Sequence, residues 1–157
     1  MVMTMNDDQF LSWMDEVLAL AAEAGEQGEV PVAAIITSPE GEVLARASNR
    51  VERDGDPTAH AEILAIKIAA KKLGNTRLDG CDLWVSLEPC PMCAGAIAHA
   101  RIRRLYYGAD DEKSGGVAHG PRVFNHPTCH HKPEIYSGLS AEKAGQMLTN
   151  FFQQKRS

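Results

Sequence analysis

Two short motifs constrain this chain more than any other feature of its sequence. One is Thr-Ala-His-Ala-Glu at 58–62, and the other is Pro-Cys-Pro-Met-Cys at 89–93. Cysteines three positions apart, directly after a proline, predict the first turn of a helix, where both side chains share one face. Unpaired N–H groups at that helix end favour negative charge, so both sulfurs are biased toward the thiolate that binds metal.

His60, Cys90 and Cys93 together offer one imidazole nitrogen and two thiolates. A structural zinc site normally has four protein ligands, whereas three ligands and a water are typical of a catalytic site. Glu62 lies two positions after His60, so on a regular helix it points to a different side and suits proton transfer better than ligation. The motifs therefore predict a hydrolytic centre with one Zn²⁺ per chain.

Other interpretations of these residues remain open at this stage. Cys-x-x-Cys alone is also typical of thioredoxin-type redox pairs, and a lone histidine such as His60 is more often a capping or core residue. Cys81 or Cys129 as a fourth ligand would make the zinc site structural. The combination of His-x-Glu with Pro-Cys-x-x-Cys outweighs these alternatives, because it is the signature of zinc deaminases.

The length and composition are those of a single soluble domain, expected to span residues 1–157. Hydrophobic residues make up 44% and charged residues 24% of the chain. No apolar run approaches the ~20 residues of a membrane span, and no basic, apolar signal segment begins the chain, so we expect a cytoplasmic protein. Without a secretion signal, its 4 cysteines favour metal binding or catalysis over disulfides.

The net charge of −5 argues against a nucleic-acid partner, but the charges are unevenly distributed. Residues 1–99 contain 7 Lys and Arg against 16 Asp and Glu, whereas residues 100–157 contain 9 against 5. We therefore expect any polyanion to meet the C-terminal third. Solvated helix faces on an acidic enzyme would produce the same pattern, so charge alone does not separate the two.

Hydrophobic periodicity predicts an α/β fold, one mixed five-stranded sheet with helices on both faces. Helices are expected at 7–25, 59–73, 90–100 and 140–153, and strands at 31–37, 43–47, 82–87, 105–109 and 134–136. The first two strands form a hairpin, and the strand–helix–strand unit at 82–109 implies a parallel crossover. Thr58 is expected to cap the second helix, whose side chains Ile63, Leu64, Ile66, Ala70 and Leu73 would face the sheet. Residues 48–57 and 110–132 are expected to be loops.

The chain resembles the bacterial tRNA-specific adenosine deaminases of the cytidine deaminase-like superfamily. The resemblance rests on both zinc motifs and on the matching stretches 29–32, 48–50, 56–62, 87–96 and 151–152. It implies the three-layer α/β/α cytidine deaminase-like fold and hydrolytic conversion of the wobble adenosine of an arginine tRNA to inosine. It further implies a Zn²⁺ cofactor, a tRNA anticodon loop as partner, a homodimer and no membrane association.

The resemblance also implies the roles of individual residues. His60, Cys90 and Cys93 would hold zinc, and Glu62 would carry protons between the water, the adenine ring nitrogen and the departing ammonia. The residues expected to contact substrate are Asn49, Val32, Leu87 and Ala61 around the base, Asp111, Lys113 and Ser114 along flanking nucleotides, and Phe151, Phe152, Lys155 and Arg156 on the last helix.

Two rival functions and one departure accompany this interpretation. A deaminase of a free base or nucleoside, such as guanine or cytosine, shares many of these sequence motifs. A non-catalytic zinc or RNA-binding module is a rival from another class of protein.

The residues at 115–131 differ from those usual in the family and include four histidines and a cysteine. We expect a mobile substrate loop there rather than a second metal site, because no regular element fixes its geometry.

Overall fold

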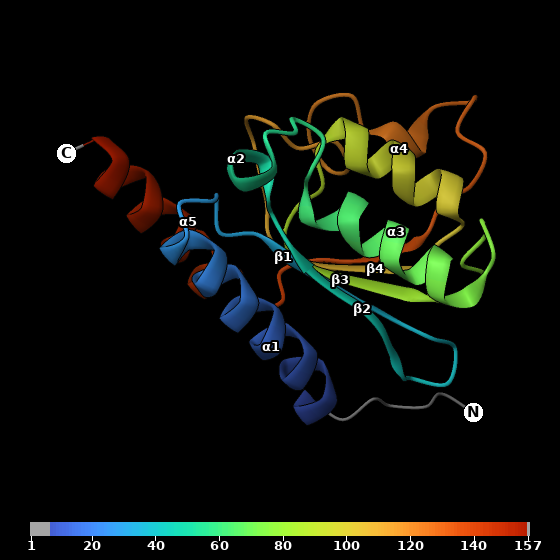
Figure 1. The fold of residues 1–157 in the computed structure, drawn as a ribbon. Coiled ribbons are helices and arrows are strands. Elements are labelled where there is room, and N and C mark those ends of the chain that lie inside the picture. The colour runs from blue at the N-terminus through green and yellow to red at the C-terminus, as the bar shows by residue number, and fades with distance from the viewer. Residues whose placement is uncertain (1–6, 157) are drawn as a thin grey trace.

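The structure is a computed structural model that describes residues 7–156, with side chains from residue 13 onward. Its helices and strands alternate along most of the chain (Figure 1). In chain order they are α1 Asp7–Glu26, β1 Ala33–Thr37, β2 Val43–Ser48, α2 Val51–Asp54, α3 Ala61–Leu73, β3 Asp82–Leu87, α4 Pro91–Ala100, β4 Arg104–Ala109, the 3-10 helix η1 Val123–Asn125, β5 Glu134–Tyr136 and α5 Ala141–Arg156.

The five strands form one mixed sheet in the order β2-β1-β3-β4-β5. β1 pairs antiparallel with β2 and β3, while β3–β4 and β4–β5 are parallel. The predicted hairpin and the predicted parallel crossover are therefore both confirmed. Both metal-motif helices, α3 and α4, follow strands that end at the same edge of the sheet, which brings their first residues together.

Helices cover both faces of this sheet, as Figure 1 shows for α3 and α4 on one side and α1 and α5 on the other. Successive residues of β1 point to opposite faces, as the period of a strand requires. Ala34 and Ile36 pack with α3 and α4, whereas Ala33 and Ile35 pack with α1 and α5. The predicted three-layer α/β/α fold is confirmed.

The buried face of α3 differs from the one we predicted. Its buried residues are the small Ala61, Ala65 and Ala69 together with Glu62, while Leu73 is 45% exposed. Alanines let the helix approach the sheet closely. Of the residues predicted to face the sheet, Ile66 and Ala70 pack against the core as expected, and Ile63 and Leu64 are half-buried. The prediction that Leu73 faces the sheet was wrong, because the helix turns its smallest residues inward.

Two local predictions also need correction. Residues 51–54, expected in a loop, form the short helix α2, and the carboxylate of Glu29 rather than a local side chain caps it. Thr58 does not cap α3: its hydroxyl donates to Asp56 at 2.8 Å, and His60 is the residue that precedes the helix.

Within the described part of the chain, no helix is long and apolar enough to cross a membrane.

Candidate metal centre and active-site cleft

His60 and Cys90 occupy equivalent positions, each immediately before the first residue of a helix. Both have extended backbone, and Pro91 begins α4 with the φ angle that a helix start requires. His60 Nδ1 lies 3.6 Å from Cys90 Sγ and 3.6 Å from Cys93 Sγ. The three atoms lie within 4.8 Å of one another. The fold therefore assembles one imidazole nitrogen and two sulfurs from two helix starts.

The spacing of these three atoms fits a tetrahedral zinc ion. With Zn–N and Zn–S bonds of about 2.1 and 2.3 Å, tetrahedral angles place nitrogen and sulfur about 3.6 Å apart. Neither Cys81 nor Cys129 belongs to this group among the described residues. Cys129 Sγ instead donates to the carbonyl of His131 at 3.3 Å. The donor set thus offers three protein ligands and leaves a fourth position for another group.

Hydrogen bonding within the trio determines where its protons lie. A hydrogen bond from the Cys93 thiol, helped by His60, lowers the pKa of Cys90 to about 4. The same pairing with Cys90, together with burial, raises the pKa of Cys93. The hydrogen bond between His60 and Cys90 raises the pKa of the His60 imidazole. The expected bias toward the thiolate that a metal ligand requires is therefore found for Cys90, whereas pairing with Cys90 and burial favour the thiol form of Cys93.

Glu62 lies beside the trio, in the first turn of α3, and is almost fully buried at 4% exposure. Burial, together with the negative charge of Cys90, raises the pKa of its carboxyl to about 7 against the opposing effects of its own backbone N–H and of His60. Glu62 is not part of the three-residue metal group, although it lines the same cleft.

A cleft of about 380 Å³ opens over this centre. It contains most of the residues predicted to meet substrate, and these are Val32, Asn49, Leu87, Asp111, Ser114, Phe151, Phe152 and Lys155 with His60, Glu62 and Cys90. Three predicted contacts do not line it: Ala61 is fully buried, and Lys113 and Arg156 are exposed outside it. The volume lies within the range of small-ligand pockets.

Asn49 is held in the cleft wall by its side-chain oxygen. That Oδ1 atom accepts the backbone N–H of Ala61 at 2.8 Å. The N–H is one of those at the start of α3 that lack a helical partner. Asn49 lines the cleft, and this hydrogen bond commits its side-chain oxygen to the backbone of Ala61.

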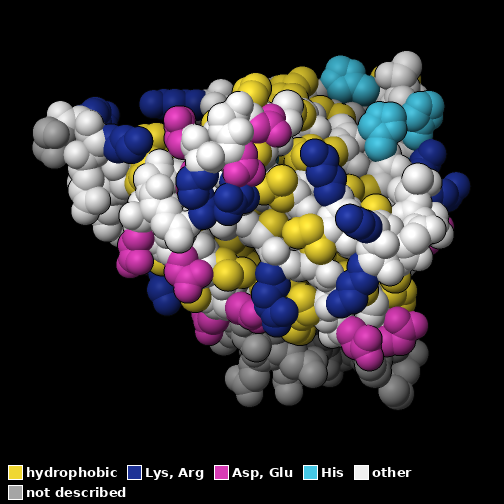
Figure 2. Space-filling view, viewed as in Figure 1, with side chains coloured by type: hydrophobic (Ala, Val, Ile, Leu, Met, Phe, Trp, Pro, Cys, Tyr) yellow, Lys and Arg dark blue, Asp and Glu magenta, His cyan; other side chains and the backbone are white. Residues whose placement is uncertain are grey.

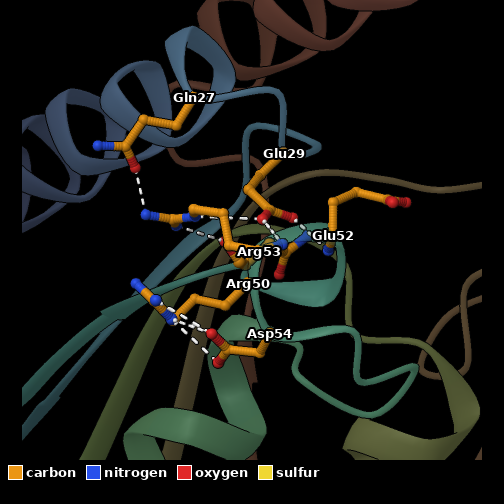
Figure 3. Close-up of polar contacts among 7 residues, drawn as sticks. Gln27, Glu29, Arg50, Glu52, Arg53 and Asp54 are labelled. Carbon is orange, nitrogen blue, oxygen red and sulfur yellow. Dashed lines mark hydrogen bonds and ion pairs between the residues drawn. The ribbon is translucent and has the colours of Figure 1, made fainter.

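An ion pair between the buried Glu29 and Arg53 of α2 secures this wall (Figure 3). The carboxylate of Glu29, 1% exposed, accepts the N–H groups of Glu52 and Arg53 at 3.1 and 2.8 Å and the Nε of Arg53 at 3.1 Å. Arg53 also donates to the carbonyl of Asn49 at 2.9 Å and to Gln27. Burial raises the pKa of Glu29, but these donors lower it below its usual value. Glu29 thus holds α2 in place, and Arg53 of that helix bonds the backbone of Asn49.

Another part of the wall comes from the loop at residues 111–119, which we call the cleft loop and of which Asp111 and Ser114 line the cleft. It begins with a tight turn in which the Asp111 carboxylate accepts the N–H groups of Lys113 and Ser114 at 3.2 and 2.9 Å. Its far end is tied to the buried carboxylate of Glu88. The expectation that nothing fixes this region was wrong, because Glu88 and the helix η1 both anchor it.

The last turns of α5 close one side of the cleft. Phe151 and Phe152 lie edge to face with ring centroids 5.4 Å apart, and the ammonium of Lys155 lies 5.4 Å from the Phe151 centroid. Phe152 is 46% exposed, which is unusual for a large aromatic side chain. Two aromatic faces and a cation at a cleft mouth suit stacking with bases and contact with phosphate.

The histidines after the cleft loop do not form a second metal trio. Figure 2 shows histidine side chains gathered at one corner of the molecule. His126 instead faces the carbonyl of Pro121 at 2.6 Å and His131 that of Ile102 at 2.7 Å. Among the described residues, the second close group of potential ligands is Glu88, Asp110 and His119.

Sequence reasoning missed the cleft residues Gly28, Glu29, Val30, Val51, Glu52 and Glu88. Glu29 lies in a stretch that supported the family resemblance, and Glu88 directly precedes the Pro-Cys-x-x-Cys motif. The position of Glu88 directly before the metal motif was the available signal. It could not show the role of Glu88, because the hydrogen-bond partners of this carboxylate are distant in sequence.

Comparison with known proteins agrees with this geometry. The model of the MafB19-like deaminase family matches residues 6–156. A tRNA-specific adenosine deaminase of Agrobacterium fabrum is 51% identical over 144 residues, 92% of this chain and 94% of that protein. The chain superposes with a TM-score of 0.84 on a structure from a study of A-to-I editing by tRNA:A34 deaminases, 51% identical, with 87% of this chain and 98% of that one covered.

A guanine deaminase structure from Bacillus subtilis is more distant. It is 33% identical with a TM-score of 0.62, and the alignment covers 97% of this chain and 94% of that one. Both likenesses extend over nearly the whole chain, and identity is higher toward the proteins that act on tRNA. The chain belongs to the family of tRNA-specific adenosine deaminases, within the MafB19-like deaminases.

Proposed function

We propose that this protein hydrolyses the wobble adenosine of a tRNA anticodon to inosine in a zinc-dependent reaction. The observation that carries the proposal is the metal-binding trio beside a buried carboxylate, at the floor of a cleft whose mouth bears aromatic and cationic side chains. The family membership supports the substrate, because a relative with 51% identity is named a tRNA-specific adenosine deaminase and a similar structure comes from a study of tRNA:A34 deaminases at the wobble position.

In this proposal His60, Cys90 and Cys93 hold the zinc ion and Glu62 moves protons. When bound, zinc supplies a Lewis acid that makes water nucleophilic near neutral pH. Glu62 accepts a proton from the attacking water and donates it to the ring nitrogen next to C6 of adenine. It then takes the second proton of that water from the hydroxyl now bound to C6 and delivers it to the amino group, which leaves as ammonia while the C6 carbonyl of inosine forms. General acid–base transfer of this kind contributes about 10²–10⁴ in rate.

Asn49 and two apolar side chains orient the base in this proposal. The amide nitrogen of Asn49 donates to an acceptor on the purine, because its oxygen is already committed to Ala61. Val32 and Leu87 provide apolar walls. A base enters only after leaving its stack, which is less costly in an anticodon loop than in a duplex.

The remaining substrate contacts lie at the mouth of the cleft. We place Asp111 and Ser114 of the cleft loop on one side of the flanking nucleotides, and Phe151, Phe152 and Lys155 of α5 on the other. Lys113 and Arg156, exposed outside the cleft, would contact phosphates further along the RNA. Action on tRNA would place the protein in the cytoplasm.

A homodimer is part of the proposal. Ile68 on α3 and Met92 on α4 are 45% and 38% exposed, and Figure 2 shows hydrophobic side chains among Lys and Arg over the face that carries these helices. A second copy of the chain would cover this apolar surface. Light scattering should give twice the monomer mass, and Ile68→Asp should reduce it, whereas a monomeric wild type would contradict the dimer.

A guanine deaminase is the second candidate, since a guanine deaminase structure is 33% identical over nearly all of this chain. The two functions separate in one assay. Purified protein is incubated with an arginine tRNA bearing a wobble adenosine and, in parallel, with free guanine, cytosine and adenosine. We expect inosine at the wobble position. Ammonia release from a free base, with the tRNA unchanged, would replace the proposed function by the second one.

A further inference from the structure

Glu88 is the most heavily hydrogen-bonded carboxylate near the metal centre. Its side chain is 0% exposed. One oxygen accepts the N–H of Asp111 at 3.0 Å and the ring Nδ1–H of His119 at 2.8 Å. The other accepts the backbone N–H groups of Val117, Ala118 and His119 at 3.1, 3.0 and 3.1 Å. Five donors from both ends of the cleft loop thus converge on one residue.

The cleft loop packs directly on the turn that carries the first cysteine. The N–H of Gly116 donates to the carbonyl of Pro89 at 2.8 Å. A Cβ atom on Gly115 would lie 2.3 Å from Glu88 Oε2, and one on Gly116 would lie 2.6 Å from the nitrogen of Pro91. Only glycine fits at these two positions. The loop is therefore in contact with residues 88–91 through Asp111 and residues 115–119.

A cation is not the partner of this carboxylate. Glu88, Asp110 and His119 offer ligand atoms within 4.8 Å of one another. The N–H groups around Glu88, however, direct their positive ends at both of its oxygens, where a metal would need lone pairs. The environment is that of a bound anion, in which the anion is part of the protein itself.

We propose that Glu88 is a positioning residue, which locks the cleft loop onto the turn that carries Cys90 and so holds Asp111 and Ser114 at the mouth of the cleft. Glu88 is adjacent to Pro89 in the chain, so the floor and this wall of the cleft share one anchor. Because the wall is already ordered in the free protein, substrate binding does not lose the conformational entropy that ordering the loop would cost. The inference rests on the proposed function for the identity of the substrate, but not for the geometry.

Glu88→Gln is the sharpest variant, because it conserves size and removes the charge. Both oxygens of the carboxylate accept N–H donors, so an amide must point its own NH₂ group at one set of donors in either orientation. His119→Ala is a milder second variant, since it removes one ring donor from a side chain that is 28% exposed. Glu134→Gln is the matched control, a carboxylate on β5 paired with Arg104 far from the cleft.

The experiment measures amide hydrogen exchange, bound zinc, and kcat and KM with a wobble-adenosine tRNA for all four proteins. In Glu88→Gln we expect protection of the amides of Asp111 and residues 117–119 to fall at least tenfold, zinc to stay near one per chain, and KM to rise about tenfold with a smaller change in kcat. His119→Ala should shift the same amides and KM in the same direction by a few-fold, and the control should match wild type.

The outcomes are decisive in each case. Unchanged amide protection in Glu88→Gln would overturn the proposal, and so would a loosened loop with unchanged KM. If Glu88→Gln does not fold, His119→Ala decides by the same criteria. A wild type that does not deaminate tRNA would refute the proposed function, while the exchange data would still test the anchoring of the loop.

Discussion

The side-chain oxygen of Asn49 accepts the backbone N–H of Ala61 at 2.8 Å, which connects the cleft wall to the helix that carries the metal motif. His60 lies directly before that N–H and Glu62 directly after it. One hydrogen bond therefore fixes the position of Asn49 relative to both His60, the proposed metal ligand, and Glu62, the proposed proton carrier.

Asn49→Asp should separate the two hydrogen-bonding roles of this side chain. The carboxylate retains an oxygen for Ala61 but replaces the amide donor, so we expect kcat/KM to fall about 10–100-fold, as loss of one or two hydrogen-bond energies to a substrate implies. Asn49→Ala should lose as much activity and also about 1–2 kcal/mol of unfolding free energy, because the N–H of Ala61 loses its partner. Full activity in Asn49→Asp would contradict the assigned donor role.

Zinc removal should lower stability as well as activity. Because the trio is assembled only in the folded chain, bound zinc stabilises the native state, and we expect dialysis against a chelator to lower Tm by about 5–10 °C. Zn²⁺ should restore Tm and Mg²⁺ should not, since the donors are sulfur and nitrogen. Cys93→Ser should no longer retain zinc, whereas Cys129→Ser should; the reverse pattern would remove Cys93 from the ligand set.

The buried carboxylate of Glu29 should make stability depend on pH. Its pKa is lowered in the folded state from an ordinary value of 4.5, since its backbone and Arg53 donors outweigh burial. The direction of the pH dependence follows from linkage. A carboxyl whose pKa is lower in the folded than in the unfolded state stabilises the protein fully at pH values above its unfolded-state pKa. This contribution is lost as the pH falls from the unfolded-state pKa through the folded-state pKa.

Urea unfolding of Glu29→Gln tests this dependence. At pH 7 the variant should be about 1–3 kcal/mol less stable than wild type, as removal of a buried, hydrogen-bonded carboxylate implies. The difference should shrink progressively below about pH 4.5. The exposed Glu26→Gln serves as control. A difference between wild type and Glu29→Gln that is constant from pH 7 to pH 3 would show that the charge of Glu29 is not involved.

RNA binding should be salt-dependent through the end of α5. Neutralising Lys155 and Arg156 together should weaken binding about tenfold at low salt and reduce the slope of log K against log salt concentration by about one to two, as two lost phosphate contacts imply. Replacing Lys132 and Lys143 by Gln removes the same charge elsewhere and controls for net charge. Equal affinity and slope in the two double variants would show that the end of α5 is not a contact surface.

Features encoded locally were predictable from the sequence. The strand at 82–87 was placed with its observed bounds, because a mostly apolar run such as Leu83, Trp84, Val85 and Leu87 indicates a buried strand. The metal trio was predictable because Pro91 and the cysteine spacing specify a helix start, and His60 precedes a second one. The fold class followed from the order of these elements along the chain.

Features that depend on distant partners were not predictable. α2 has four residues, and its N–H groups are satisfied by Glu29, 23 and 24 positions away from its bonding partners. The cleft loop is ordered by Glu88, whose partners are 23–31 positions later. In both cases a buried carboxylate replaces local hydrogen bonds, and a pattern read within one segment cannot show which segment supplies it.

Glu62→Gln tests the central claim most directly, with inosine formation at the wobble position of an arginine tRNA and bound zinc measured on the same samples. The amide occupies the same buried position but cannot carry a proton between water and base. We predict that deamination falls by about 10²–10⁴ while zinc stays near one per chain. Wild-type turnover in Glu62→Gln, or full activity in wild-type protein from which zinc has been removed, would contradict the account.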